Sequence, residues 1–232
     1  TESDMIGIIG AMAVEVEKIK NDIQDKKTEI ISGIEFISGN LYGKYAVVAK
    51  CGVGKVFASL CAEIMILKYS PEFIISTGVA GSLSENVGTL DVVVGKTVVQ
   101  HDMDTSAVGD PVGMISGINV IHISTDSVFS RAVEIIIRGM GHRCINGTVA
   151  SGDRFVCTEE DKKYITDNFG AVACEMEAAA IGQVCYVNSL PFIIIRTISD
   201  NADGSSSLDY PVFLEKAAAT SADIVKSFIL SL

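Results

Sequence analysis

The sequence predicts a single α/β domain in which helices flank a central mixed β-sheet. Short apolar runs alternate along the chain with amphipathic stretches, as strands alternate with helices in such folds. The run PFIIIRTIS, at 191–199, carries apolar residues on both faces, which is typical of a central strand covered by helices on each side. With 232 residues, 48% of them hydrophobic, the chain can bury one large core and is short for two domains.

Apolar runs and helix signals locate the elements in order along this domain. We expect strands at 5–9, 34–38, 45–51, 73–77, 91–99, 145–150, 171–174 and 191–198. We expect helices at 13–25, 55–69, 126–140, 159–169, 176–188 and 210–230.

Turn-forming residues set several of these boundaries. The first strand breaks at Gly10, and residues 33–49 predict two strands around a turn. Pro71 and Pro211 mark the boundaries of elements, because proline disfavours helix in the residue before it.

The helix at 159–169 has the clearest end signals. Thr158 is a capping residue with an acid three positions on, and Gly170 follows the last turn. By contrast, segment 101–119 has little periodicity, and a loop of that length in one domain is usually functional or disordered.

Composition excludes several classes of protein. The net charge of -11 argues against a nucleic-acid partner, because phosphate binding needs clustered Lys and Arg. No apolar run approaches the roughly 20 residues that cross a bilayer, so no membrane association is expected. The six cysteines form no C-x-x-C pair and favour buried free thiols in the cytoplasm.

The first residues, TESD, are polar and acidic and do not resemble a signal peptide. We expect residues 1–4 to be a tag remnant or disordered, and residues 5–232 to form the domain.

Four strand ends carry residues suited to chemistry, and ligands of open α/β sheets collect beyond such ends. The four stretches are GAMAVE with Glu15, STGVAGSL with Ala80 and Gly81, ACEMEAAA with Glu175 and Glu177, and TISDNADG with Asp200. Each stretch also has a purely structural interpretation. Glu15, Glu175 and Glu177 could be acids at helix starts, Asp200 could form a helix cap or an Asx-turn, and the glycines could form a tight turn.

The functional interpretation of Asp200 is a partly desolvated carboxyl that donates a proton near neutral pH, oriented by Ser199. HDMD, at 101–104, offers one His and two acids, which is too little for a metal site, so we expect neither a metal nor a cofactor. No Ser–His–Asp or Cys–His arrangement is present in an elbow such as G-x-S-x-G.

Together these stretches resemble one family. IGIIGAMAVEVE, STGVAGSL, HDMD, SGDRFV, CEMEAAAI and RTISDNAD occur in that order and are similar to motifs of the 5'-methylthioadenosine/S-adenosylhomocysteine nucleosidases, within the nucleoside phosphorylase and hydrolase superfamily. The resemblance covers nearly the whole chain. It implies a mixed, partly closed sheet, a homodimer, and hydrolysis of the bond between adenine and a 5'-thio-substituted ribose.

The resemblance also implies roles for individual residues. Glu15 falls on the water-activating glutamate, and Asp200 on the acid that protonates adenine N7, held by Ser199. The other matching positions are Met176 and Glu177 at the ribose, with Glu175 beside them, Phe155 and Val156 at the adenine, Ala80 and Gly81 beside the ribose and water, and Phe213 near the thioalkyl pocket. Acid and base on opposite sides of one sugar suit inverting glycoside hydrolysis, and nearby carboxylates stabilise the oxocarbenium charge.

Alternatives within and outside the superfamily remain. A purine or uridine phosphorylase would need arginines for phosphate, and this chain has none before Arg131, so water is the better nucleophile. The loop at 101–119 lacks the aromatic residues with which relatives cover the partner's 5'-thio group, so the sequence leaves the preferred 5' substituent undecided. A further candidate substrate is 5'-deoxyadenosine, and an alternative function is hydrolysis of 6-amino-6-deoxyfutalosine. A non-catalytic nucleoside-binding protein would typically have lost one of the carboxylates, and none is lost here.

Overall fold

Ten strands form one mixed sheet in residues 5–232, the part of the chain that the computed structural model describes. The expectation for residues 1–4 lies outside the described residues. The strands are β1 (Ile6–Gly10), β2 (Gln24–Ile31), β3 (Ile34–Leu41), β4 (Lys44–Lys50), β5 (Phe73–Ser82), β6 (Val92–Gln100), β7 (Ile123–Ser124), β8 (Cys144–Ser151), β9 (Ala171–Glu175) and β10 (Phe192–Asp200). The helices are α1 (Ala13–Asp22), α2 (Lys55–Tyr69), α3 (Ser127–Gly139), α4 (Glu159–Phe169), α5 (Ala178–Val187) and α6 (Ser206–Ser231), with a 3-10 turn η1 (Ser106–Val108).

Part of the sheet closes on itself, which confirms the expectation of a partly closed mixed sheet. Strand β5 pairs with β10, and the sheet continues through β6, β8 and β9 back to β5. From β5 the sheet extends outward through β1 and β4 to the antiparallel strands β3 and β2. Strands β1, β5 and β10 lie side by side and parallel, so their carboxyl ends meet at one edge.

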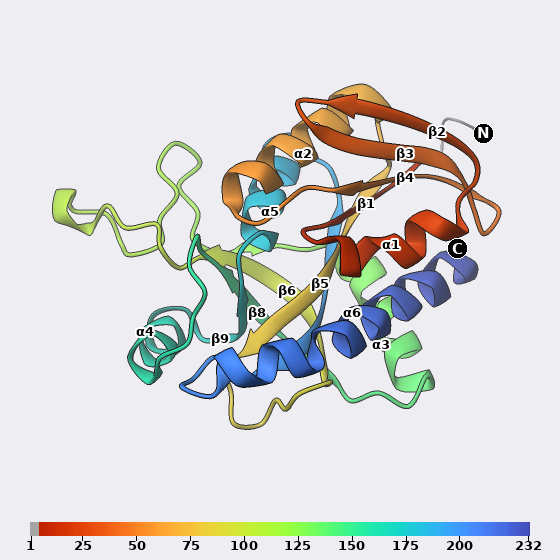
Figure 1. Ribbon diagram of the computed structural model, residues 1–232. Coiled ribbons are helices and arrows are strands. Elements are labelled where there is room, and N and C mark those ends of the chain that lie inside the picture. The colour runs from red at the N-terminus through yellow and green to blue at the C-terminus, as the bar shows by residue number, and fades with distance from the viewer. Residues whose placement is uncertain (1–4) are drawn as a thin grey trace.

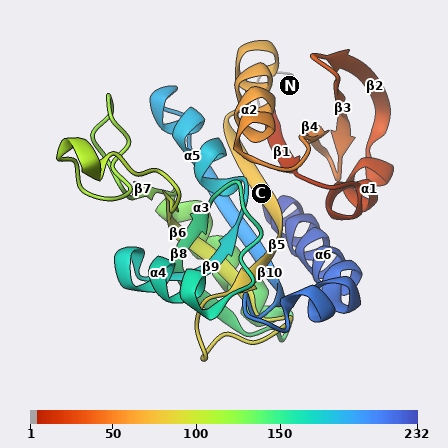
Figure 2. The same cartoon turned by 60° about the vertical axis from the view of Figure 1, so that its left-hand side comes forward.

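Helices cover the sheet in two groups (Figure 1, Figure 2). Helices α2 and α5 pack together on one side, and α1, α3 and α6 pack together on the other. Each group builds its own hydrophobic core, with Met65 and Ile181 in the first and Ile19 and Phe228 in the second. The three central strands are therefore buried on both faces, as the apolar run at 191–199 predicts.

The first and last helices and strand β2 differ clearly from the sequence expectation. The helix expected to reach residue 25 ends at Asp22, because Ile23 is already extended, and strand β2 follows it. Strand β2 is an edge strand exposed along nearly its whole length, so it has no hydrophobic alternation that would reveal it. Helix α6 begins at Ser206, one turn before the expected start, with Pro211 inside it.

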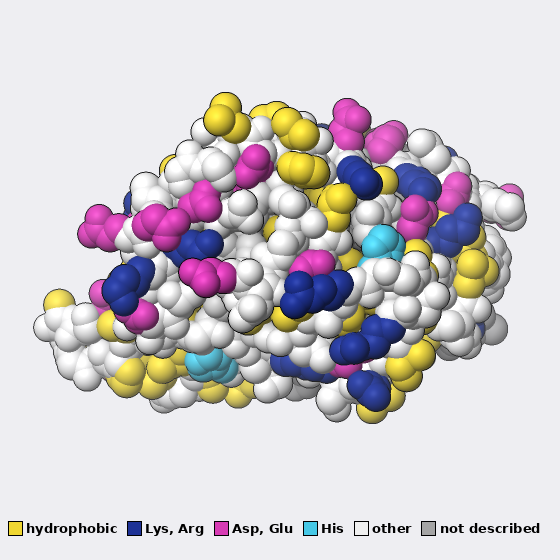
Figure 3. Space-filling model, turned by 90° about the horizontal axis from the view of Figure 1, so that it is seen from below, with side chains coloured by type: hydrophobic (Ala, Val, Ile, Leu, Met, Phe, Trp, Pro, Cys, Tyr) yellow, Lys and Arg dark blue, Asp and Glu magenta, His cyan; other side chains and the backbone are white. Residues whose placement is uncertain are grey.

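Segment 101–119 projects from the body of the molecule (Figure 1, Figure 2). It contains η1, an isolated bridge joins its Ile115 to Val120 just beyond it, and Val108 in η1 is 83% exposed. On the face drawn in Figure 3, acidic and basic side chains are interspersed. Among the helices of residues 5–232, none combines the length and apolar character needed to cross a membrane.

Candidate active site

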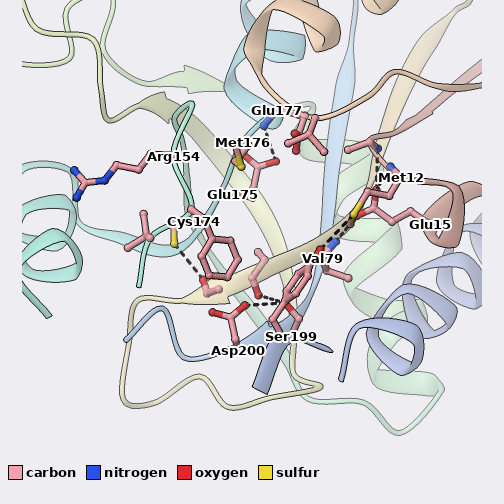
Figure 4. A pocket seen from close by; sticks show the side chains of 17 residues that line it. Met12, Glu15, Val79, Arg154, Cys174, Glu175, Met176, Glu177, Ser199 and Asp200 are labelled. Atoms are coloured by element: carbon pink, nitrogen blue, oxygen red, sulfur yellow. Dashed lines mark hydrogen bonds between the residues drawn. The ribbon is translucent and has the colours of Figure 1, made fainter. Parts of the chain in front are cut away.

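A cavity of about 90 Å³ lies at the carboxyl ends of β1, β5 and β10. Its lining comes from these strand ends and from the segments after β8 and β9 (Figure 4). The lining residues are Ala11, Met12, Glu15, Val53, Val79, Ala80, Gly81, Arg154, Phe155, Val156, Cys174, Glu175, Met176, Glu177, Ser199, Asp200 and Tyr210. The four strand ends singled out in the sequence thus meet at one place.

Glu15 is fixed by three backbone N–H groups. Oε2 accepts hydrogen bonds from the N–H groups of Ala11 at 2.8 Å and Met12 at 2.9 Å, and Oε1 accepts one from Val79 at 3.0 Å. The bond from Met12 is the reach-back contact of a helix-start acid, so the structural interpretation of Glu15 also holds. The bond from Val79, on β5, goes beyond helix capping and aligns the carboxylate with the cavity.

Burial raises the pKa of Glu15 above its ordinary value, since its residue is only 3% exposed. The charge of Arg196 and the three N–H donors oppose this shift without cancelling it. A carboxylate with a raised pKa is a stronger base than an exposed one and accepts a proton more readily.

Asp200 ends β10 and is held in one orientation. Oδ2 accepts a hydrogen bond from the Ser199 hydroxyl at 2.9 Å, and Oδ1 accepts one from the backbone N–H of Ala202 at 2.9 Å. The bond to Ala202 is the Asx-turn that the sequence allowed, while Ser199 is fully buried and lies within 3.4 Å of the Ala80 carbonyl. Asp200 itself is 2% exposed and lines the cavity together with Glu15.

Two glycines of β5 make room for these two carboxylates. A Cβ added at Gly78 would lie 2.4 Å from Oε1 of Glu15, and one at Gly81 would lie 3.0 Å from Oδ1 of Asp200. The TGVAG stretch therefore needs small residues because the backbone of β5 passes against both acids. Glu15 and Asp200 approach the same cavity from α1 and β10 (Figure 4).

Glu177 approaches the cavity from the start of α5. Its Oε1 accepts a hydrogen bond from the backbone N–H of Gly54 at 2.7 Å. Burial, with a smaller contribution from neighbouring Glu175, raises the pKa of Glu177 to about 8. One carboxylate oxygen carries no protein hydrogen bond among those of the described residues, so it is available to a ligand hydroxyl.

Glu175 lines the cavity, but its carboxylate is occupied by the protein. It accepts hydrogen bonds from Arg196 Nη2 at 2.7 Å, from the Ser151 hydroxyl, and from the N–H of Ala178 at the start of α5. Its side chain is 4% exposed and that of Arg196 is 3% exposed, so the two charges form a buried pair.

Arg196 is a residue that sequence reasoning missed. It lies in the middle of β10, where it also donates to the carbonyl and hydroxyl of Ser76. Its guanidinium interacts with Glu15, Glu175 and Glu177, and Glu175 contributes most to raising the pKa of Arg196. A charged residue within the strand PFIIIRTIS was the signal available, because a buried arginine needs acidic partners.

Tyr210 is the second residue that was missed. Its ring meets the ring of Phe155 edge to face, with centroids 5.5 Å apart, and its hydroxyl donates to the sulfur of Met12 at 3.3 Å. Phe213, one turn further along α6, is absent from the lining, so Tyr210 supplies the aromatic wall on this side. The other predicted site residues, from Ala80 to Asp200, all line the cavity.

The positive charges near the cavity are already engaged. Arg154 lines it, but its guanidinium points away from the other labelled side chains (Figure 4) and bonds Asp161 at 2.6 Å. Arg196 is paired with Glu175. Within residues 5–232, no three His, Cys, Asp or Glu side chains are grouped to hold a metal ion. The site as built offers carboxylates to a polar neutral ligand.

Known proteins are similar to this chain in sequence and in fold. A model of the phosphorylase superfamily matches residues 5–230. A 5'-methylthioadenosine/S-adenosylhomocysteine nucleosidase of Shewanella loihica is 38% identical over 226 residues, which cover 97% of this chain and 98% of the relative. The crystal structure of the nucleosidase of that name from Neisseria meningitidis, in complex with methylthio-immucillin-A, has a TM-score of 0.95, 34% identity, and covers 99% of this chain and 100% of its own.

A further solved structure carries a different name. The native futalosine hydrolase of Helicobacter pylori has a TM-score of 0.95 and 35% identity, with 99% of each chain covered. Proteins of this fold and degree of similarity thus carry names that refer to different substrates.

Proposed function

The chain belongs to the phosphorylase superfamily and, within it, to the 5'-methylthioadenosine/S-adenosylhomocysteine nucleosidases, and we propose that it hydrolyses 5'-methylthioadenosine and S-adenosylhomocysteine. The products are adenine and the corresponding 5-thioribose. The observation that carries this proposal is that Glu15 and Asp200, from opposite ends of the chain, line one cavity.

Asp200 is the general acid in this proposal. Adenine leaves poorly as an anion, and a proton placed on N7 makes it a neutral leaving group. The bonds from Ser199 and Ala202 hold the carboxyl in one orientation, and Phe155 and Tyr210 provide apolar surface for the base. A proton held on Asp200 is then delivered to the base while the glycosidic bond breaks.

Glu15 is the general base. Water attacks the anomeric carbon from the face opposite the departing base, so a second carboxylate is required on that side. The three N–H donors fix Glu15, and its raised pKa favours removal of a proton from water. Glu177 holds the ribose hydroxyls, and the carboxylate of Glu15 stabilises the positive charge that develops on the sugar.

Water is favoured over phosphate as the nucleophile. The two arginines that line or border the cavity, Arg154 and Arg196, already have acidic partners. A phosphate dianion would have to displace one of these pairs.

The decisive experiment follows release of free adenine by the purified protein, with and without phosphate. We expect 5'-methylthioadenosine and S-adenosylhomocysteine to be cleaved without phosphate, with 5'-deoxyadenosine as a further substrate to test. Asp200→Asn should lower kcat by about 10²- to 10⁴-fold, the usual contribution of a positioned acid, while Asp167→Asn on α4 leaves it unchanged. Strict dependence on phosphate, or full activity of Asp200→Asn, would contradict the proposal.

A second candidate is hydrolysis of 6-amino-6-deoxyfutalosine. It is favoured by the similarity to a futalosine hydrolase and by a 101–119 loop without aromatic residues. The same adenine assay decides between the substrates through their kcat/KM values.

We also propose that the protein is a cytoplasmic homodimer. The exposed side of α2 and the residue before its N-cap carry apolar side chains, defined here as the apolar stripe: Val53, Val56, Phe57, Leu60 and Leu67. Several exposed apolar side chains gathered along one helix are typical of a subunit interface. The projecting 101–119 loop would then lie near the partner's active site, and the six cysteines, all free, fit a reducing compartment.

A further inference from the structure

Three residues outside the cavity form a closed cycle of hydrogen bonds. Lys55 Nζ donates to Oδ1 of Asp102 at 2.6 Å. Oδ2 of Asp102 accepts from the backbone N–H of Asp153 at 2.9 Å, and Oδ1 of Asp153 accepts from the backbone N–H of Lys55 at 2.7 Å. The contacts return to the residue where they began, and we refer to them as the Lys55–Asp102–Asp153 cycle.

Each member of the cycle borders a segment that contributes to the site. Lys55 follows Gly54, whose N–H bonds Glu177, and Asp153 directly precedes Arg154 in the segment that carries Phe155. Asp102 lies just beyond the end of β6. The cycle therefore sets the spacing between the turn that holds Glu177 and the wall that carries Phe155.

The start of α2 explains why two acids gather there. Helix α2 has no acidic side chain in its first turn, and its free N–H groups carry partial positive charge. Glu177 and Asp153, from distant parts of the chain, satisfy the N–H groups of Gly54 and Lys55. Gly54 has a φ of 100°, and a Cβ there would lie 3.0 Å from Oδ1 of Asp153, so the turn is fitted closely to this acid.

The ion pair in the cycle is partly withdrawn from water. The side chains of Lys55 and Asp102 are 17% and 32% exposed, and Lys55 Nζ also donates to Gln100 Oε1 at 3.0 Å. Each member of this ion pair has one further hydrogen-bond partner, so the pair is more strongly oriented than an isolated surface pair.

We propose that Lys55 is a positioning residue of the nucleoside site. It acts through Asp102 and Asp153, keeping the Gly54 turn and the Phe155 segment at the spacing that lets Glu177 meet the ribose while the base lies against Phe155. This inference rests on the proposed function for its catalytic consequence. The cycle itself is a property of the unliganded protein and is tested without turnover.

The test compares Lys55→Met with Lys68→Met, since both lysines lie on α2 and both are ion-paired, the second with Glu29 at 2.5 Å. Hydrogen exchange of the ligand-free protein is followed by mass spectrometry. Lys55→Met should exchange faster only in peptides covering 52–56 and 152–156, whereas Lys68→Met should leave both unchanged. Unchanged exchange in these peptides, or faster exchange spread over the whole chain, would overturn the proposal.

Kinetics supply the second readout. Lys55→Met should raise KM by about tenfold with a smaller change in kcat, since small misplacements weaken substrate positioning. Lys55→Arg, which can still reach Asp102, should restore KM. If the wild-type protein cleaves no nucleoside, the proposed function is wrong, but the exchange test still shows whether the cycle holds the two segments together. Wild-type KM in Lys55→Met would refute the positioning role alone.

Discussion

The charged form of Glu177 is destabilised by burial and by the nearby acids Glu175 and Glu15. Its pKa is about 8 in the folded protein and is near 4.5 when exposed. Between these values the folded protein binds a proton that the unfolded chain has lost, so the free energy of unfolding contributed by Glu177 falls as pH rises.

Glu177→Gln removes this titration but can still accept from Gly54. We therefore expect the Tm of Glu177→Gln, relative to wild type, to rise between about pH 5 and pH 8.5 in the ligand-free protein. Calorimetry at several pH values measures this difference. Glu29→Gln is the control, because the pKa of Glu29 is lowered instead of raised, so removing its titration cannot make the difference in Tm rise with pH. A difference in Tm that stays constant with pH for Glu177→Gln would show that Glu177 does not titrate there.

Single residues differ in how well the sequence reveals them. Asp200 was predictable because it ends an apolar strand, and Glu15 because it lies in the first turn of the helix after one, at the edge where ligands collect. Arg196 was hidden inside such a strand, and its importance depends on Glu175, which is distant in sequence. Tyr210 lies in a helix whose orientation over the cavity is set by tertiary packing.

Among the elements, α6 begins in an unusual way. Pro211 lies at the sixth residue of the helix, where it lacks the N–H that would donate one turn back, and no side chain caps the start. The first turn, which ends at Tyr210, is therefore weakly held.

Pro211→Ala should restore the missing hydrogen bond and raise the free energy of unfolding by about 2 kcal/mol, after the entropy lost with proline is subtracted. Thermal unfolding measures the change. Val212→Ala, at the exposed neighbouring position, is the matched control and should have little effect. A lower Tm for Pro211→Ala would mean that the proline stabilises this start instead of weakening it.

The elements themselves follow from the sequence to different degrees. Buried strands and capped helices such as α4 carry strong local signals, with Thr158 accepting from the N–H of Asp161 as expected. The exposed edge strand β2 is specified by its pairing with β3 and not by its own pattern. The closure of the sheet between β9 and β5 rests on pairings of distant segments, which periodicity does not encode.

At the scale of the whole molecule, the apolar stripe predicts association. Val56 is 78% exposed in the single chain, so a charge there costs little in a monomer and much in an interface. We expect the wild-type protein to sediment at twice the mass of one 24.6 kDa chain, and Val56→Glu to sediment as a single chain.

Ile135→Glu, on α3 in the opposite helix group, is the matched control because Ile135 is also exposed and apolar. It should remain dimeric. A wild-type mass of one chain, or an unaltered mass for Val56→Glu, would show that α2 does not form a subunit interface.

The central strand β5 lies between the first strand of the chain and the last. A nascent polypeptide still emerging from the ribosome therefore holds only one of the two acids until its final strand has been made. During refolding, the same arrangement means that catalysis resumes only after β1 and β10 have both paired with β5. The time at which adenine release returns would therefore report when both ends of the chain have docked on β5, which spectroscopic signals from early helices cannot report.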